Sequence, residues 1–215
     1  MAMRTQDLVS RLAWNVPPVE RDAVQKRLTH ALTTGLGGSA VLLVALYGIS
    51  SDMPQQILTP MFWFRLAFPL ASVAAALKLA ERLASPGVSL GLAWLATLLP
   101  IAAMLLVAAT LWLATPPHYR LQWDFGTTGW TASAAVVLLS LPSLAAVMHA
   151  LKRLAPTRLT LTGAAAGLLG GSQGLLVYAL YCSETPVPFW SIWHVSAILI
   201  TAGIGAVCAP RYLRW

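Results

Sequence analysis

Five side chains with metal-binding or redox chemistry occur in or beside the polar segments that separate long apolar stretches: Cys182, Glu184, His118, His194 and Asp124. Sulfur, imidazole and carboxylate groups together can bind a transition metal, and an exposed thiol can be oxidised. The chain has no compact ligand motif such as CxxC or HExxH, so ordinary loop and helix-end roles are the interpretation we favour. Cys182, His118, His194 and Glu184 are kept as the alternative, a set of candidate metal ligands, and no other cofactor is expected.

The elements that must position these side chains are membrane-spanning helices. The 215 residues are 58% hydrophobic and 10% charged, with a mean hydropathy of +0.71, which is not the composition of a water-soluble domain. A helix needs about 20 apolar residues to cross a bilayer. Six such stretches occur, at residues 29–49, 61–80, 90–115, 127–151, 159–181 and 189–209. We predict an all-α membrane protein, a six-transmembrane-helix bundle without room for a soluble catalytic domain, and hence no enzyme.

The distribution of Lys and Arg predicts how the bundle is oriented. Twelve of the 14 lie in the N-terminal segment, the second and fourth connections and the C-terminal tail, whereas the other three loops hold only Arg120. Because cytoplasmic loops retain basic residues, both termini are predicted to be cytoplasmic. Counting the acidic residues gives 12 − 4 = +8 inside and 1 − 3 = −2 outside. This positive face favours membrane lipid as a partner and no direct nucleic-acid binding, although the pI is near 10.

The two cysteines are predicted to lie on opposite sides of the membrane. Cys182 follows the fifth stretch on the outer side, and Cys208 lies at the inner end of the sixth. A disulfide needs Cα atoms within about 7 Å, whereas the hydrocarbon core is about 30 Å thick. An intramolecular disulfide is therefore excluded.

Glycines recur every four residues along the fifth stretch, at Gly163, Gly167 and Gly171, and Gly170 and Gly174 repeat the interval. Small residues on one helix face let a second helix approach closely. Close packing is the interpretation we favour, with a substrate path as the alternative. The same faces would permit a homodimer. Together with prolines inside three spans, they also motivate an alternative function, that of a small six-span transporter or exporter.

One charged residue, Arg65, is predicted to lie inside a span, a few residues from its outer end. Its side chain could extend to the interface or pair with Asp52, Asp124 or Glu184. Aromatic residues, most of them Trp, crowd the same side of the membrane. An interfacial belt is the interpretation we favour for them, and the wall of an outer cavity is the alternative.

The longest segment outside the predicted spans is residues 1–28, which we treat as a cytoplasmic arm attached to a transmembrane domain of residues 29–215. In the arm, Asp7 and Arg11 have helical i,i+4 spacing, and Leu8 and Leu12 share an apolar side. A short amphipathic helix can lie on a membrane surface or dock into a groove of a soluble partner. One basic residue in this helix is little for lipid anchoring, so a protein partner is favoured.

Five segments carry a family resemblance. They are RTQDLVSRLAWNVPPV, TPMFWFRLAFPLA, LLSLPSLAAVMHALKRLAPTR, GLLVYALYCSETPVPFWSIWHV and the terminal APRYLRW. In this order and spacing, over nearly the whole chain, they resemble the NrsF-type membrane anti-sigma factors of bacteria, a family named for negative regulation of sigma F.

The resemblance implies a multi-pass protein of the bacterial cytoplasmic (inner) membrane. Such a protein holds an extracytoplasmic-function sigma factor inactive and releases it on an envelope, metal or oxidative signal. Its N-terminal segment would hold the sigma factor, which makes Asp7, Leu8, Arg11 and Leu12 the candidate partner-binding residues. Cys182 falls where the family carries a cysteine and is the candidate signal-sensing residue. A second family cysteine is replaced within GWTASA, residues 129–134, which argues against a paired-thiol sensor.

Overall fold

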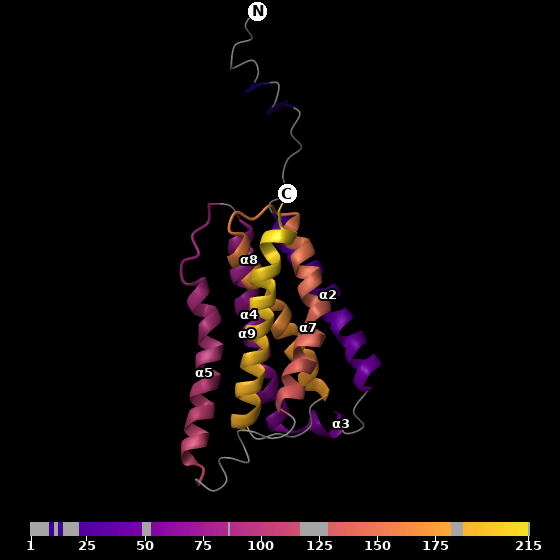
Figure 1. Cartoon of the computed structure of the whole chain (residues 1–215), viewed down its shortest axis with the longest axis vertical. Coiled ribbons are helices and arrows are strands. Elements are labelled where there is room, and N and C mark those ends of the chain that lie inside the picture. The colour runs from indigo at the N-terminus through magenta and orange to yellow at the C-terminus, as the bar shows by residue number, and fades with distance from the viewer. Residues whose placement is uncertain are drawn as a thin grey trace, which may run out of the picture.

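The computed structural model describes residues 9–10, 13–14, 22–48, 53–85, 87–116, 129–181 and 187–214, and the side chains of all of these except 187–190. In this part of the chain all regular structure is helical. Six helices are long and apolar enough to cross a membrane, which confirms the predicted all-α six-span architecture. They are α2 (Ala23–Tyr47), α4 (Pro60–Ala84), α5 (Ala93–Ala114), α7 (Gly129–Lys152), α8 (Leu159–Tyr181) and α9 (Val187–Tyr212), with a short α3 (Met53–Gln56) between the first two (Figure 1).

The six long helices run alternately up and down, so α2 begins and α9 ends at the same end of the bundle (Figure 1). The first helix starts at Ala23, before the predicted apolar stretch at residue 29. Its first turns carry Lys26 and Arg27, and the adjacent Leu28 is fully buried. The apolar stretch from residue 29 therefore predicts the membrane-crossing part of α2, and the helix continues beyond it at the N-terminal end, where Leu28 packs against the other helices.

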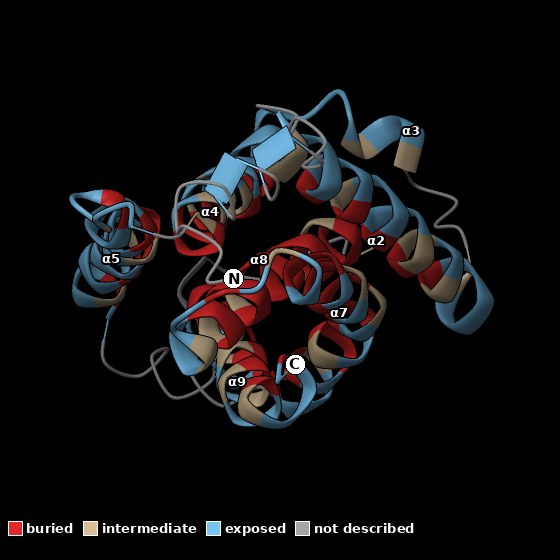
Figure 2. Ribbon diagram, turned by 90° about the horizontal axis from the view of Figure 1, so that it is seen from above, coloured by how far each residue is buried: buried red, intermediate tan, exposed pale blue. Residues whose placement is uncertain are grey.

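The central helix is α8, which contacts α2, α4, α7 and α9 (Figure 2). It is the most buried of the six spans and the least hydrophobic, whereas the peripheral α5 is the least buried and the most hydrophobic. This order is expected in a membrane, because lipid rewards apolar side chains on the outside while close helix packing needs small ones inside. Helix α5 lies at the edge of the bundle, where it packs against α4 and α9 (Figure 2).

Two rows of glycine on α8 serve two different neighbours. A β-carbon on Gly163 would collide with the Gly205 carbonyl oxygen, and one on Gly167 with the Thr201 carbonyl oxygen, both on α9. On the second row, a β-carbon on Gly174 would lie 2.7 Å from the backbone nitrogen of Ser140 on α7. The glycines are therefore occupied by helix packing inside one chain, which confirms the packing interpretation.

Buried polar side chains join the same helices by hydrogen bonds. The hydroxyls of Ser39 on α2 and Ser143 on α7 lie 2.8 Å apart, and those of Ser140 and Thr201 join α7 to α9 at 3.2 Å. Gln173 of α8 donates its Nε2 hydrogen to the Leu32 carbonyl oxygen of α2 at 2.9 Å. Such bonds add specificity where apolar burial cannot drive helix association. They hold α2 against the core of α7, α8 and α9.

The prolines inside the spans do not divide their helices. Pro69, Pro100 and Pro142 lie within α4, α5 and α7, each of which is continuous from end to end. Transporters of several folds instead use half-helices whose broken ends bind substrate. These three prolines do not supply that feature.

Candidate functional site

Charge separates the two ends of the bundle. Nine of the ten Lys and Arg among the described residues lie at the end where α2 begins and α9 ends, hereafter the basic end: Lys26, Arg27, Lys78, Arg82, Lys152, Arg153, Arg158, Arg211 and Arg214. The tenth, Arg65, lies near the opposite end, hereafter the aromatic end, where Phe62, Trp63, Trp130 and Trp193 gather. The predicted grouping of basic charge on one side of the spans is confirmed for these residues.

The arm leads directly into a membrane span. Asp7, Leu8, Arg11 and Leu12, the predicted partner-binding residues, lie outside the described residues, so their role stays a prediction. Of the arm's first 18 residues the structure describes 9–10 and 13–14, all four helical and exposed, with Trp14 96% exposed. Residues 23–28 of the arm already belong to α2. Any movement of α2 is therefore passed to the base of the arm without an intervening loop.

A buried polar group occupies the aromatic end. Arg65 of α4 is only 7% exposed and donates from Nη2 to the Gln56 Oε1 atom of α3 at 3.3 Å. The structure thus buries the guanidinium inside the protein rather than extending it to the interface. The three acidic partners proposed from sequence lie outside the described residues. Charged groups inside a membrane protein mark functional positions by default because they are costly to bury.

His194 belongs to this buried group. It lies in α9, is 2% exposed, and its ring meets the Tyr178 ring of α8 edge to face with centroids 6.0 Å apart. It is also close enough to Arg65 to interact with its charge. The sequence placed His194 in the sixth apolar stretch and among the candidate metal ligands of the outer side, and the structure buries it where α9 packs against α8.

The remaining candidate metal ligands, Cys182, His118 and Glu184, lie outside the described residues, as does Asp124. Among the described residues, no three His, Cys, Asp or Glu side chains lie close enough to hold a metal ion. The metal site therefore stays a prediction that His194 alone neither supports nor excludes. Cys208 is exposed and free near the basic end of α9, whereas α8, which directly precedes Cys182, ends at the opposite end of the bundle (Figure 1).

A chain of aromatic rings links the buried group to α2. The ring centroids of Tyr178 and Tyr181 lie 6.3 Å apart, and those of Tyr181 and Tyr47 lie 5.0 Å apart. Tyr47 is the last residue of α2. Tyr181 is the residue immediately before Cys182. Rings in contact at these distances resist independent movement. The rings thus connect Tyr181, which precedes the predicted sensing residue Cys182, with His194 and with α2.

Sequence reasoning missed this connection. The spacing of Tyr178 and Tyr181, three residues apart on one helix, was available as a signal that both rings share a face. Their contacts with Tyr47 and His194 depend on which helices are neighbours, and the chain order does not determine that.

The first residues of α7, where the family resemblance places its second cysteine, pack against α9. A β-carbon on Gly129 would collide with the indole of Trp193, and Ser133 donates its hydroxyl to the Trp193 carbonyl oxygen at 2.9 Å. In this chain, glycine and serine at the start of α7 therefore serve close packing at the aromatic end.

Six apolar spans with a basic end and a buried polar group at the other end define a multi-pass membrane protein. The chain belongs to the family of negative regulators of sigma F, because the NrsF family model matches residues 12–215. A probable anti-sigma-F factor NrsF of Azospira oryzae is 35% identical over 99% of this chain and all of its own length. The anti-sigma-F factor NrsF of Caulobacter vibrioides is 34% identical over the same shares of the two chains. No solved structure matches significantly. The family resemblance inferred from sequence motifs is thus confirmed.

Proposed function

We propose that this protein is a membrane-bound anti-sigma factor that sequesters an extracytoplasmic-function sigma factor through its N-terminal arm. The observation that carries the proposal is the match of the whole chain to two relatives named as anti-sigma-F factors. The protein resides in the bacterial inner membrane and releases its partner on an envelope, metal or oxidative signal. As a regulator it acts by binding rather than by catalysis.

The charge distribution supports the side on which the sigma factor binds. The end at which α2 begins holds nine of the ten described basic residues, and basic residues mark the cytoplasmic side of membrane proteins. The arm then lies in the cytoplasm, where sigma factors act. The aromatic end faces outward, where an envelope signal would arrive.

The contacts at the aromatic end support a route for that signal. A modification or ligand at Cys182 would disturb Tyr181, which directly precedes it and contacts both Tyr178 and Tyr47. Tyr47 ends the helix that begins at the arm. A signal that favours a second packing of these rings would shift α2 and weaken the arm's hold on the sigma factor.

Deletion of residues 1–18 tests the sequestration. We expect the shortened protein to insert normally and the cognate sigma factor to disappear from the membrane fraction, with its target genes transcribed constitutively. A hold of about 1 µM corresponds to about 8 kcal/mol, so a loss of about 3 kcal/mol already raises the dissociation constant more than a hundredfold. A sigma factor that still co-purifies with the shortened protein and stays silent would show that the arm is not the binding segment.

Replacement of Cys182 by serine tests the signal input. We expect target transcription to lose most of its response to metal and oxidant, because serine provides neither a thiolate ligand nor an oxidisable sulfur. Cys208→Ser is the matched control, since Cys208 is exposed at the basic end and should leave the response unchanged. An undiminished response in Cys182→Ser would remove the thiol from the mechanism.

The transporter alternative loses the features that motivated it. The glycine rows of α8 are filled by α7 and α9, and Pro69, Pro100 and Pro142 lie inside continuous helices. The same occupied glycines also remove the original reason for a homodimer, which remains a separate expectation about oligomeric state. An anti-sigma factor needs neither a substrate path nor a second copy.

A further inference from the structure

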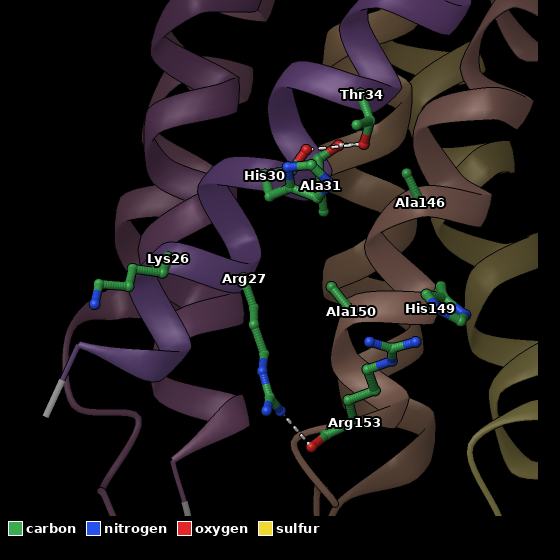
Figure 3. A pocket seen from close by; sticks show the side chains of 9 residues that line it. All are labelled: Lys26, Arg27, His30, Ala31, Thr34, Ala146, His149, Ala150 and Arg153. Atoms are coloured by element: carbon green, nitrogen blue, oxygen red, sulfur yellow. Dashed lines mark hydrogen bonds between the residues drawn. The ribbon is translucent and has the colours of Figure 1, made fainter. Parts of the chain in front are cut away.

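A pocket opens between the first turns of α2 and the last turns of α7 at the basic end (Figure 3). Its volume is about 360 Å³. The cationic side chains of Lys26, Arg27 and Arg153 belong to its lining, together with His30 and His149. Figure 3 shows the Arg27 side chain extending from α2 to the end of α7, where the Arg153 side chain lies along α7 near His149.

The pocket has a surplus of positive charge. None of its lining residues is acidic, and across the described ranges neither Arg27 nor Arg153 forms an ion pair. Arg27 donates from Nη1 to the Arg153 carbonyl oxygen at 2.8 Å, which fixes one guanidinium at the end of α7 and leaves its other hydrogens available. The Arg27 guanidinium held this way and the Arg153 guanidinium that lines the same pocket offer several donors to one anion, and guanidinium donors suit phosphate.

The deeper wall of the pocket is apolar. Ala31, Ala146 and Ala150 line it farther from the basic end than the cations do, and their small side chains create the space. Still deeper, the helices close on each other, because a β-carbon on Gly35 would lie 2.8 Å from the Cα atom of Ser143. The pocket is thus a wedge, with cations at its mouth, methyl groups along its walls and a helix crossing at its base.

The depth of this wedge in the membrane indicates its ligand. Arg27 is four residues from the start of α2, roughly 6 Å along the helix, and Arg153 directly follows the end of α7. The predicted membrane spans begin at residue 29 and end at residue 151, so we expect Arg27 and Arg153 at the level of lipid headgroups and the alanines where acyl chains begin. A free anion would use only the mouth of the wedge, whereas a phospholipid would use the mouth and the apolar walls together.

We infer that this pocket binds an anionic phospholipid, with Arg27 and Arg153 holding the phosphate and Ala31, Ala146 and Ala150 contacting the glycerol and the first part of an acyl chain. Basic pockets between membrane helices bind such headgroups because each cation near the surface contributes about 1 kcal/mol of attraction. The bound lipid would hold the start of α2 against the end of α7. The inference is independent of the sigma-binding role of residues 1–18.

Native mass spectrometry and thermal unfolding of the purified full-length protein in a neutral detergent test the site. The probes are cardiolipin, phosphatidylglycerol, phosphatidylcholine and inorganic phosphate. We expect retained cardiolipin or phosphatidylglycerol and a raised unfolding temperature, and little effect of phosphatidylcholine. Arg27→Gln/Arg153→Gln should weaken binding of the anionic lipid about thirtyfold. Inorganic phosphate that binds or stabilises as well as the lipid would overturn the lipid assignment.

Three further variants separate the site from general charge and from misfolding. Arg211→Gln/Arg214→Gln removes the same charge at the same end of the bundle and should keep the lipid. Arg153→Gln alone preserves the bond from Arg27, which uses a backbone carbonyl, and should weaken lipid binding without lowering the unfolding temperature of lipid-free protein. Ala146→Leu should weaken lipid binding while all cations remain. Equal loss in the Arg211 and Arg214 control, or loss of the sigma factor instead of lipid in the pocket variants, would refute the inference.

Discussion

Replacement of Gly167 by alanine is expected to destabilise the folded bundle by about 3 kcal/mol, near the upper end of the usual cost of an added methyl group in a packed core. The new β-carbon would collide with the carbonyl oxygen of Thr201 and would lie 2.5 Å from the Cα atom of Ala202, both of them α9 backbone atoms. A flexible side chain could rotate away, but a helix backbone cannot. Helices α8 and α9 would have to separate along the face that Gly163, Gly167 and Gly171 share.

Gly203→Ala is the matched control, with the same chemical change one helix away. Gly203 lies on α9, and a β-carbon there would meet no atom within 4 Å. Alanine is the better helix former by roughly 1 kcal/mol, so this variant should be neutral or slightly stabilising. Reversible unfolding in detergent, followed by circular dichroism, measures both variants. Equal effects of the two substitutions would mean that the α8 and α9 contact is not the close one described here.

Replacement of both Leu8 and Leu12 by aspartate is expected to release the sigma factor, the second large effect. If the arm binds as an amphipathic helix, these two leucines lie one turn apart on its apolar side. Burial of a leucine contributes about 1.5–3 kcal/mol, so the pair accounts for a loss of more than a hundredfold in affinity. Titration of the unchanged protein and of the double variant with labelled sigma factor gives a dissociation constant for each.

Gln6→Asp/Ser10→Asp is the control for the charge that this variant introduces. It adds the same two carboxylates at the same spacing, on the opposite side of the helix, and should change the affinity severalfold at most. Equal weakening by both double variants would indicate repulsion of acidic charge rather than loss of apolar contacts. An unchanged affinity in both would place the contact elsewhere in the protein.

The spans and the glycine packing were predictable from sequence because both depend on local spacing. Twenty apolar residues indicate a membrane crossing wherever they occur, and glycines four apart share a face of any helix. The partner of each face was not predictable, since it depends on which helices become neighbours. The two glycine rows of α8 illustrate this difference: the spacing was visible, but their division between α7 and α9 was not.

The buried group at the aromatic end shows the same limit more sharply. Among the described residues, Arg65 donates to the amide oxygen of Gln56, which comes from a four-residue helix that hydropathy does not detect. The acidic partners suggested by its charge lie outside the described residues and stay a prediction. His194 was expected near the outer end of the sixth apolar stretch, residues 189–209, as a candidate metal ligand. It is 2% exposed and its ring packs against Tyr178 of α8, a neighbour that the sequence does not specify. The pocket between α2 and α7 likewise joins residues more than 100 positions apart.

The close approach of α2 to α7 gives the first helix the mechanics of a lever. The pivot point of α2 lies between Gly35 and Ser39, the two residues of this helix that contact Ser143 of α7. From the middle of this contact, Tyr47 is roughly 15 Å away along the helix and Ala23 roughly 21 Å, from the rise of 1.5 Å per residue. If α2 turned as a rigid rod about this contact, a sideways shift of Tyr47 would swing Ala23 about 1.4 times as far in the opposite direction. A helix pivoted in this place enlarges a small displacement at the aromatic end before the displacement reaches the arm.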